Sequence, residues 1–143
     1  MCIRDSFESY PQIKEYMNKS IEVAREKGYV ETICGRKRML PDIHSHNSVV
    51  RGYAERNAIN APIQGSAADI IKIAMIRIAK RLENEHLRSR MILQVHDELN
   101  FNVPVEEIER VKAIVCEEME NAYPLQVPLL ADSGVGHNWL EAH

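Results

Sequence analysis

The sequence has few cysteines, few aromatic residues and no long apolar run, and each shortage excludes a class of protein. The three cysteines, Cys2, Cys34 and Cys116, are odd in number and far apart, which argues against a disulfide framework and a zinc site. No segment approaches the roughly 18 apolar residues of a membrane-spanning helix, and residues 1–10 contain no apolar run of the signal-peptide type. We therefore expect a protein of the reducing cytoplasm with no membrane partner.

The composition is that of an ordinary globular domain, but the charge is unevenly distributed. The chain has 143 residues, of which 45% are hydrophobic and 27% charged. Residues 1–90 contain 16 Lys and Arg against 11 Asp and Glu, whereas residues 91–143 contain 2 against 10. The excess of basic residues in the first part favours binding of a polyanion, and the excess of acidic residues in the second favours binding of metal cations. A charged surface in contact with solvent explains much of the same distribution.

Hydrophobic periodicity predicts an α+β fold, with one small antiparallel sheet and helices packed on one side of it. We expect a helix over residues 7–27 that ends at Gly28, and a hairpin over residues 29–40 with a two-residue connection, Cys34-Gly35. A helix from Ser48 should break before Pro62 and restart at a capping box formed by Ser66 and Asp69. The remaining expected elements are a hairpin over residues 91–103, a helix over residues 105–122, a short strand over residues 126–131 and an aromatic anchor at Trp139.

Residues 91–103, MILQVHDELNFNV, are the stretch around which we expect the chain to be organised. A buried strand over residues 91–95 runs into His96-Asp97-Glu98, and an alternating apolar stretch leaves on the other side. Strands on both sides would hold a carboxylate rigidly and leave its oxygens free, as metal-dependent phosphate chemistry requires. The alternative is a solvated turn, because turns favour Asp for backbone hydrogen bonding alone.

Three long polar side chains, Arg56, Asn60 and Gln64, recur at intervals of four residues. This spacing predicts one strip of hydrogen-bond donors along a helix face. The minor groove of a duplex offers acceptors at every base pair whatever the sequence, so the strip could follow paired DNA without reading it. The competing interpretation is that this helix face is polar only because it is exposed to solvent.

The carboxylates near Asp97 are too few for a complete two-metal site. Asp97 and Glu98 are adjacent, and neighbours on a strand point to opposite faces. A phosphoryl-transfer site with two metal ions needs several carboxylates, so we expect residues outside these 143 to complete it. We assign no role to His44 and His46, and a metal phosphohydrolase built on His96 and Asp97 ranks far behind, since the histidines lack ligand spacing.

Several motifs together resemble the C-terminal part of the polymerase domain in the A family of DNA polymerases, in one register over roughly residues 7–143. In this sequence they read GYVET, GRKR, LP, AERNAINAPIQG, AADIIK, QVHDEL and NW. The resemblance implies a right-hand polymerase in which residues 7–143 form the last part of the fingers and much of the palm. We interpret residues 1–6, which do not match, as a non-native or truncated start.

The resemblance also implies roles for individual residues. Asp97 matches the palm aspartate that holds the catalytic metals, with Glu98 beside it and His96 near the primer terminus. Positions that contact the primer–template duplex are matched by Arg51, Arg56, Asn60 and Gln64. The implied cofactor is Mg²⁺ in a two-metal site, and the implied partners are primer–template DNA, deoxynucleoside triphosphates and the remainder of the polymerase chain.

The departures from the family limit what these residues can do alone. The second palm aspartate and the nucleotide-binding helix of the family are not in this chain, and Asn100 is polar where related sequences tend to be apolar. We therefore expect template-directed DNA synthesis in replication and repair, in the nucleoid region of a bacterial cytoplasm, from a C-terminal fragment that is inactive alone. The alternative is a non-catalytic module that binds the primer–template duplex.

Overall fold

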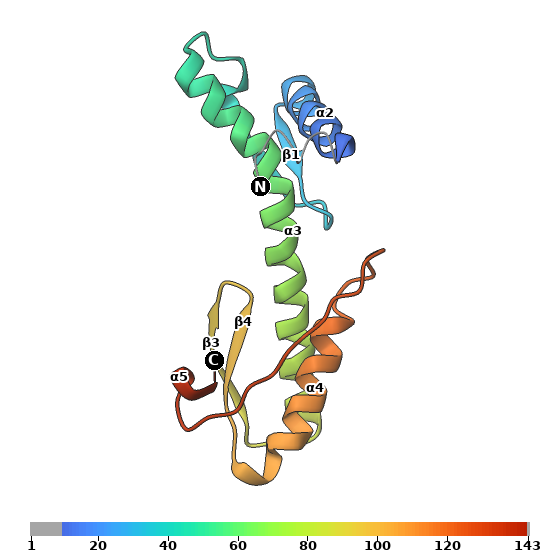
Figure 1. Ribbon diagram of the computed structural model, residues 1–143, viewed down its shortest axis with the longest axis vertical. Coiled ribbons are helices and arrows are strands. Elements are labelled where there is room, and N and C mark those ends of the chain that lie inside the picture. The colour runs from blue at the N-terminus through green and yellow to red at the C-terminus, as the bar shows by residue number, and fades with distance from the viewer. Residues whose placement is uncertain (1–9, 143) are drawn as a thin grey trace. The chain divides into compact units, whose positions relative to one another are not determined.

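A computed structural model of the chain describes residues 10–142, which fall into two compact units divided between Asp69 and Ile70 (Figure 1). Residues 1–6, which we interpreted as a non-native start, lie outside the described residues. In chain order the elements are α2 (Pro11–Lys27), β1 (Tyr29–Glu31), β2 (Lys37–Met39), η1 (Pro41–His44), α3 (Ser48–Asn84), β3 (Arg90–Val95), β4 (Glu98–Asn102), η2 (Val105–Glu107), α4 (Ile108–Glu120) and α5 (Trp139–Ala142). No helix in this part of the chain is long and apolar enough to cross a membrane.

In the N-terminal unit, α2 ends where the sequence predicts. Pro11 occupies the first turn of the helix, where its missing N–H is not needed. Gly28 follows with a φ of 77°, and its N–H donates to the Ala24 carbonyl at 2.9 Å. The left-handed conformation at Gly28 turns the chain directly into β1.

The first hairpin is shorter than predicted. β1 and β2 pair in antiparallel register with Glu31 opposite Lys37, so the connection runs from Thr32 to Arg36 rather than over Cys34-Gly35 alone. The Gly35 N–H donates to the Thr32 carbonyl at 2.9 Å, and Gly35 has a φ of 77°. A positive φ suits a glycine in a turn, but the sequence predicts a shorter loop than the one observed.

A core of small and branched residues holds the N-terminal unit together. Its buried members come from α2, the hairpin, η1 and the first part of α3: Ala24, Val30, Leu40, Ile43, Ala54 and Ala58. Alanines on the inner face of α3 allow the hairpin and η1 to approach the helix closely.

The predicted break before Pro62 is wrong, because α3 runs without interruption from Ser48 to Asn84 with Pro62 inside it. A proline in a helix interior removes one backbone hydrogen bond and costs about 3 kcal/mol. The residues after Pro62 are hydrogen bonded to the hairpin: the Ile33 N–H donates to Ser66 Oγ at 2.9 Å, and Arg36 donates to the Gly65 carbonyl at 3.0 Å. These tertiary contacts favour continuation of the helix.

The predicted capping box at Ser66 and Asp69 is also wrong, because both residues lie inside α3. Ser66 Oγ donates to the Pro62 carbonyl, one turn earlier in the same helix. Asp69 is buried, and its carboxylate accepts hydrogen bonds from Thr32 Oγ1 at 2.6 Å and from Arg36 Nε at 2.9 Å. Residues that resemble a helix start instead hold the hairpin on the helix.

The C-terminal unit packs the end of α3 and α4 with the second hairpin. In this hairpin β3 and β4 are antiparallel, with Val95 opposite Glu98 and a bulge between Met91 and Leu93. The buried residues of the unit come from α3, α4 and the turn after α4: Ala74, Ile78, Leu82, Val111, Ile114 and Ala122. Met91, Leu99 and Phe101 pack against this core from the hairpin.

The α+β class is confirmed, but three details of the predicted sheet are wrong. Within residues 10–142 there are two separate two-stranded sheets rather than one. Residues 126–131 are not a strand, and β3 is not fully buried, since Ile92 is 65% and Leu93 47% exposed. In this hairpin the polar turn is set by the local sequence, whereas burial of β3 would require a neighbouring layer on its open face.

Candidate functional site

Asp97 lies at the tip of the β3–β4 hairpin, as the sequence predicts. Val95 and Glu98 are paired, so His96 and Asp97 form the two-residue connection between the strands. His96 has a φ of 53°, a conformation that costs a non-glycine residue about 1 kcal/mol or more. The Gln94 side-chain amide donates to the His96 carbonyl and braces this turn.

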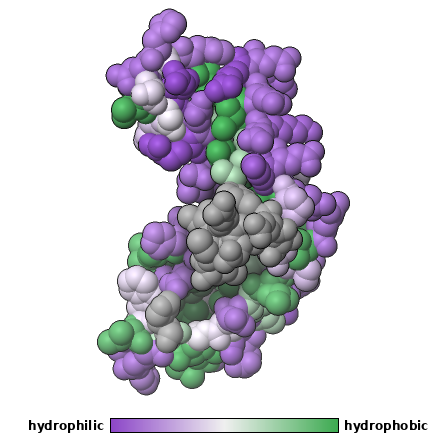
Figure 2. Space-filling model, turned by 45° about the horizontal axis from the view of Figure 1, so that its top comes forward, coloured by the Kyte–Doolittle hydropathy of each residue, from purple (hydrophilic) through white to green (hydrophobic). Residues whose placement is uncertain are grey.

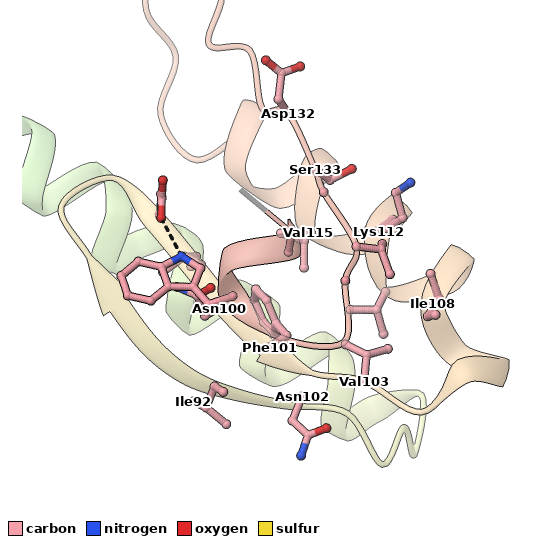
Figure 3. A pocket seen from close by; sticks show the side chains of 18 of the residues that line it. Ile92, Asn100, Phe101, Asn102, Val103, Ile108, Lys112, Val115, Asp132 and Ser133 are labelled. Carbon is pink, nitrogen blue, oxygen red and sulfur yellow. Dashed lines mark hydrogen bonds between the residues drawn. The ribbon is translucent and has the colours of Figure 1, made fainter.

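The Asp97 and Glu98 carboxylates have different surroundings. Asp97 is exposed, and its side chain makes no hydrogen bond or ion pair with the rest of residues 10–142. Glu98 is half-buried, and its Oε2 accepts a hydrogen bond from Trp139 Nε1 at 3.4 Å, drawn as the dashed line in Figure 3. Asp97 is therefore available to an external ligand, and Glu98 is held from the side by α5.

A groove of about 1470 Å³ adjoins the hairpin tip. Its walls come from β4, α4 and the chain between Leu130 and Ala142, and Figure 3 shows Phe101, Val103 and Val115 lining it with polar Asp132 and Ser133. Asn100 also lines the groove, and its Nδ2 is buried with no hydrogen-bond partner in the described part of the chain. The groove thus combines an apolar floor with an unsatisfied amide.

Glu107 fixes the base of the same hairpin. Its carboxylate accepts hydrogen bonds from Ser89 Oγ at 2.6 Å and from the backbone N–H groups of Arg88 and Ser89, both at 3.0 Å. These hydrogen bonds, that of the Ser89 hydroxyl first, lower the pKa of Glu107 below its ordinary value. The start of β3 is thereby tied to η2, which precedes α4.

The described residues do not by themselves form a metal site. Among residues 10–142 there is no group of three His, Cys, Asp or Glu side chains close enough to hold one ion. Asp97 offers one exposed carboxylate, whereas a two-metal site requires several. The donor set of the described residues therefore fits one contribution to a metal site but not a complete site.

The strip of Arg56, Asn60 and Gln64 lies on α3, and all three side chains are exposed. The opposite face of the helix carries buried Ala54 and Ala58. Arg56 lies 5.9 Å from the ring centroid of Tyr53, which is 60% exposed. The continuous helix through Pro62 places Gln64 on the same strip, so the predicted alignment is kept although the predicted break is wrong.

Arg51 does not lie on this strip. It is five residues before Arg56, which corresponds to about 140° around a helix. Its guanidinium donates to the Ser45 carbonyl at 2.8 Å and lies 4.0 Å from Glu55. Arg51 therefore holds the segment that precedes α3 against the helix. In the same segment, the His44 ring is hydrogen bonded to the Arg25 carbonyl at 2.8 Å.

The candidate residues thus fall into two sets, each positioned within its own unit. His96, Asp97 and Glu98 belong to the C-terminal unit, and Arg56, Asn60 and Gln64 belong to the N-terminal unit. Sequence reasoning missed the Gln94 brace and the contact between Trp139 and Glu98. The sequence alone gives no pairing signal for residues 41 positions apart, although the Asn138-Trp139 motif marked the right element.

The sequence of the chain is similar to those of known proteins. The family model for DNA polymerase family A matches residues 1–141. The chain is 53% identical over 140 residues to DNA polymerase I of Lactococcus lactis subsp. cremoris, covering 98% of this chain and 16% of that protein. It is also 53% identical over 136 residues to DNA polymerase I of Geobacillus stearothermophilus, covering 95% of this chain and 16% of that protein.

A solved structure shares the fold. The POL domain of Pol1 from M. smegmatis, in complex with DNA primer-template and dNTP, matches with a TM-score of 0.93 and 48% sequence identity over 95% of this chain and 24% of that chain. The chain thus spans about one sixth of the length of the two curated relatives named above, 16% in each case. Because the family match covers nearly every residue, the chain belongs to DNA polymerase family A.

Proposed function

We propose that this chain is the C-terminal fingers and palm part, residues 7–143, of a polymerase that joins deoxynucleotides to a primer 3′-hydroxyl on a DNA template. The observation that carries the proposal is Asp97, held by two paired strands at a hairpin tip with its carboxylate exposed. The family assignment and the relatives named DNA polymerase I support the same function. We place the protein in the nucleoid region of a bacterial cytoplasm, acting in replication and repair.

Within this function each residue at the hairpin has a separate role. Asp97 contributes one carboxylate to the metal site, Glu98 supports the site from the paired strand, and His96 lies near the primer terminus. The family is metal-dependent, and the metal we propose is Mg²⁺, which when bound assists ionisation of the primer hydroxyl and stabilises the leaving pyrophosphate. The other ligands come from polymerase residues outside these 143.

The strip on α3 has a different task. Arg56, Asn60 and Gln64 project from the face of α3 opposite its buried alanines, and their donors suit the acceptors that every base pair presents in the minor groove. Together they hold a correctly paired primer–template duplex. Arg51 joins this interface only if it leaves the Ser45 carbonyl, so its contribution is smaller than that of the strip.

A second candidate function is duplex binding without catalysis. It is favoured by the exposed strip together with the incomplete carboxylate set of the described residues. The two functions are compatible, because the chain alone can bind the duplex while the longer polymerase performs the reaction.

The test replaces the matching segment of Geobacillus stearothermophilus DNA polymerase I with this chain, which is 53% identical to it. In the chimera, Asp97→Asn should lower primer extension at least about a hundredfold, because a metal ligand supplies several kcal/mol of transition-state stabilisation. Duplex affinity, measured by fluorescence anisotropy, should be nearly unchanged. The measurements are single-turnover extension of a labelled primer and binding of the same primer–template.

Asp132→Asn is the matched control, since Asp132 is also an exposed aspartate that lines the groove. It should leave extension at the level of the unaltered chimera. Normal extension by the Asp97→Asn chimera would refute the role of Asp97. An inactive chimera that carries the unaltered chain would count against a catalytic function and leave duplex binding as the better account.

A further inference from the structure

The run Arg36-Lys37-Arg38 on the first hairpin is not explained by the strip or by the hairpin tip. Arg36 is engaged within the unit, since it donates to Asp69 Oδ1 at 2.9 Å and to the Gly65 carbonyl at 3.0 Å. Lys37 lies 3.7 Å from Glu31 and 4.5 Å from the centroid of the Tyr29 ring. The adjoining Tyr29 side chain, followed by the Glu31 carboxylate, raises the pKa of Lys37 above its ordinary value. Two of the three cations are therefore neutralised locally.

Arg38 differs from both neighbours. Arg38 is paired with Val30 in the hairpin register, and paired residues project from the same face of a sheet. Val30 is buried against α3, so Arg38 projects from the face of the hairpin that meets this helix. Its side chain is exposed and makes no hydrogen bond or ion pair with the described residues. Arg38 is thus a cation with an uncommitted guanidinium.

A small cleft of about 90 Å³ lies between β2 and α3. Arg36, Lys37 and Arg38 line it from the hairpin, and Ala61, Gln64 and Gly65 line it from the helix. The lining contains no carboxylate, and the partners of Arg36 and Lys37 balance their charges, which leaves about one positive charge, that of Arg38. The cleft also contains the Gln64 amide, the last member of the duplex strip. Figure 2 shows that hydrophilic residues dominate the face of this unit that is in view.

We propose that Arg38 binds a backbone phosphate of the primer–template duplex at this cleft, so that duplex contact continues from Gln64 on α3 onto β2. This inference rests on the proposed function and adds a residue to it. Arg56 and Gln64 are eight positions apart, or about 12 Å along a helix, which corresponds to three or four base pairs of duplex. A phosphate contact at the end of such a strip fixes the register of the duplex without reading its sequence.

The chemistry of the cleft favours a phosphodiester over a base edge. A guanidinium can bind a phosphate through two parallel N–H groups, and the Gln64 amide beside it remains available to the minor groove. The alternative source of phosphate is a nucleoside triphosphate or pyrophosphate. Separate binding measurements with these small ligands distinguish the two sources.

The test measures binding of a short labelled DNA duplex to the 143-residue chain at several salt concentrations between about 50 and 200 mM. Arg38→Gln should lower the slope of log affinity against log salt by about 0.9 and the affinity roughly five- to tenfold, as expected for one lost phosphate contact. Arg38→Lys should restore most of the slope, because the charge is kept. Far-ultraviolet circular dichroism checks that each variant keeps its helices.

Lys19→Gln is the matched control, since Lys19 is an exposed cation on α2 that does not line the cleft. It removes the same charge from the same unit and should leave the slope unchanged. An Arg38→Gln slope equal to that of the unaltered chain would overturn the inference, while the Asp97 experiment would still decide the proposed function. Weaker binding of pyrophosphate or of a nucleoside triphosphate by Arg38→Gln, with duplex binding intact, would also overturn it.

Discussion

Arg36 Nε donates a hydrogen bond to Asp69 Oδ1 at 2.9 Å, and this pair joins the loop of the first hairpin to the middle of α3. Thr32 Oγ1 donates to the other oxygen of the same carboxylate at 2.6 Å. The Asp69 side chain is only 11% exposed, so its carboxylate requires hydrogen-bond donors from the chain, and these two residues supply one to each oxygen. The position of the hairpin, and of the cleft beside Gln64, follows from this arrangement.

Asp69→Asn should destabilise the chain by about 1–2 kcal/mol, because it removes a charge-assisted hydrogen bond to Arg36 from a largely buried site. Urea unfolding followed by circular dichroism measures the change. Asp42→Asn, the same substitution at an exposed aspartate of the N-terminal unit, should change the stability by less than about 0.5 kcal/mol. Equal effects of the two substitutions would show that the hydrogen bonds to the Asp69 carboxylate contribute nothing to the stability.

Gly65→Ala should also destabilise the chain, although alanine favours helices by about 1 kcal/mol over glycine. A Cβ at position 65 would lie 2.5 Å from Thr32 Cγ2, so the hairpin would have to move away from α3. Gly52→Ala is the matched control in the same helix, since a Cβ there meets only Arg56 Nη1 at 3.8 Å. Gly52→Ala should raise the urea midpoint, and Gly65→Ala should lower it.

Thr32→Ser should rescue Gly65→Ala in part. Serine lacks the Cγ2 methyl that the new Cβ would strike but keeps the hydroxyl that donates to Asp69. The double variant should therefore be more stable than Gly65→Ala alone, as judged by a double-mutant cycle in urea. If the stability losses of the two single variants simply add in the double variant, the contact with Thr32 Cγ2 is not the source of the strain.

The stability of the chain should fall in acid through Glu107. Hydrogen bonds from Ser89 and from the Arg88 backbone lower the pKa of this carboxyl in the folded chain below its ordinary value of 4.5. The stabilisation is therefore complete above about pH 4.5 and is lost as the pH falls through the lower pKa of the folded state. Urea midpoints measured from about pH 7 down to pH 3 should show this decline.

Glu107→Gln should be less stable than the unaltered chain at neutral pH and should lose less stability on acidification. Glu109→Gln, the same substitution at an exposed position on α4, is the matched control and should change the stability at neutral pH by less than about 0.5 kcal/mol. Parallel pH profiles for the Glu107→Gln variant and the unaltered chain would exclude Glu107 as the source of the decline. Glu85, whose pKa is lowered mainly by a hydrogen bond from Arg110, accounts for part of any remaining decline.

Asn100→Leu should stabilise the isolated chain by about 1 kcal/mol, because the Nδ2 of Asn100 is buried without a partner among residues 10–142. Asn102→Leu is the comparison on the same strand, where the exposed amide has no such cost. The urea midpoint should rise for position 100 and stay nearly constant for position 102. A lower midpoint for Asn100→Leu would show that the amide is satisfied in solution.

The features that could be predicted correctly from the sequence are local ones. Gly28 ends α2 because a left-handed residue must follow the helix, and the His96-Asp97 turn follows from two apolar strands that flank a polar pair. The strip of Arg56, Asn60 and Gln64 follows from helix geometry once the helix exists. Each depends on interactions between residues a few positions apart.

Other features depend on contacts between residues that are distant in the sequence. Pro62 does not end α3, because hydrogen bonds from the hairpin to Gly65 and Ser66 favour a continuous helix. Asp69 does not cap a helix, because its carboxylate accepts hydrogen bonds from Thr32 and Arg36 of the hairpin and so holds the hairpin on α3. Residues 126–131 form no strand, since a strand needs a neighbour for its backbone hydrogen bonds and an apolar sequence does not supply one.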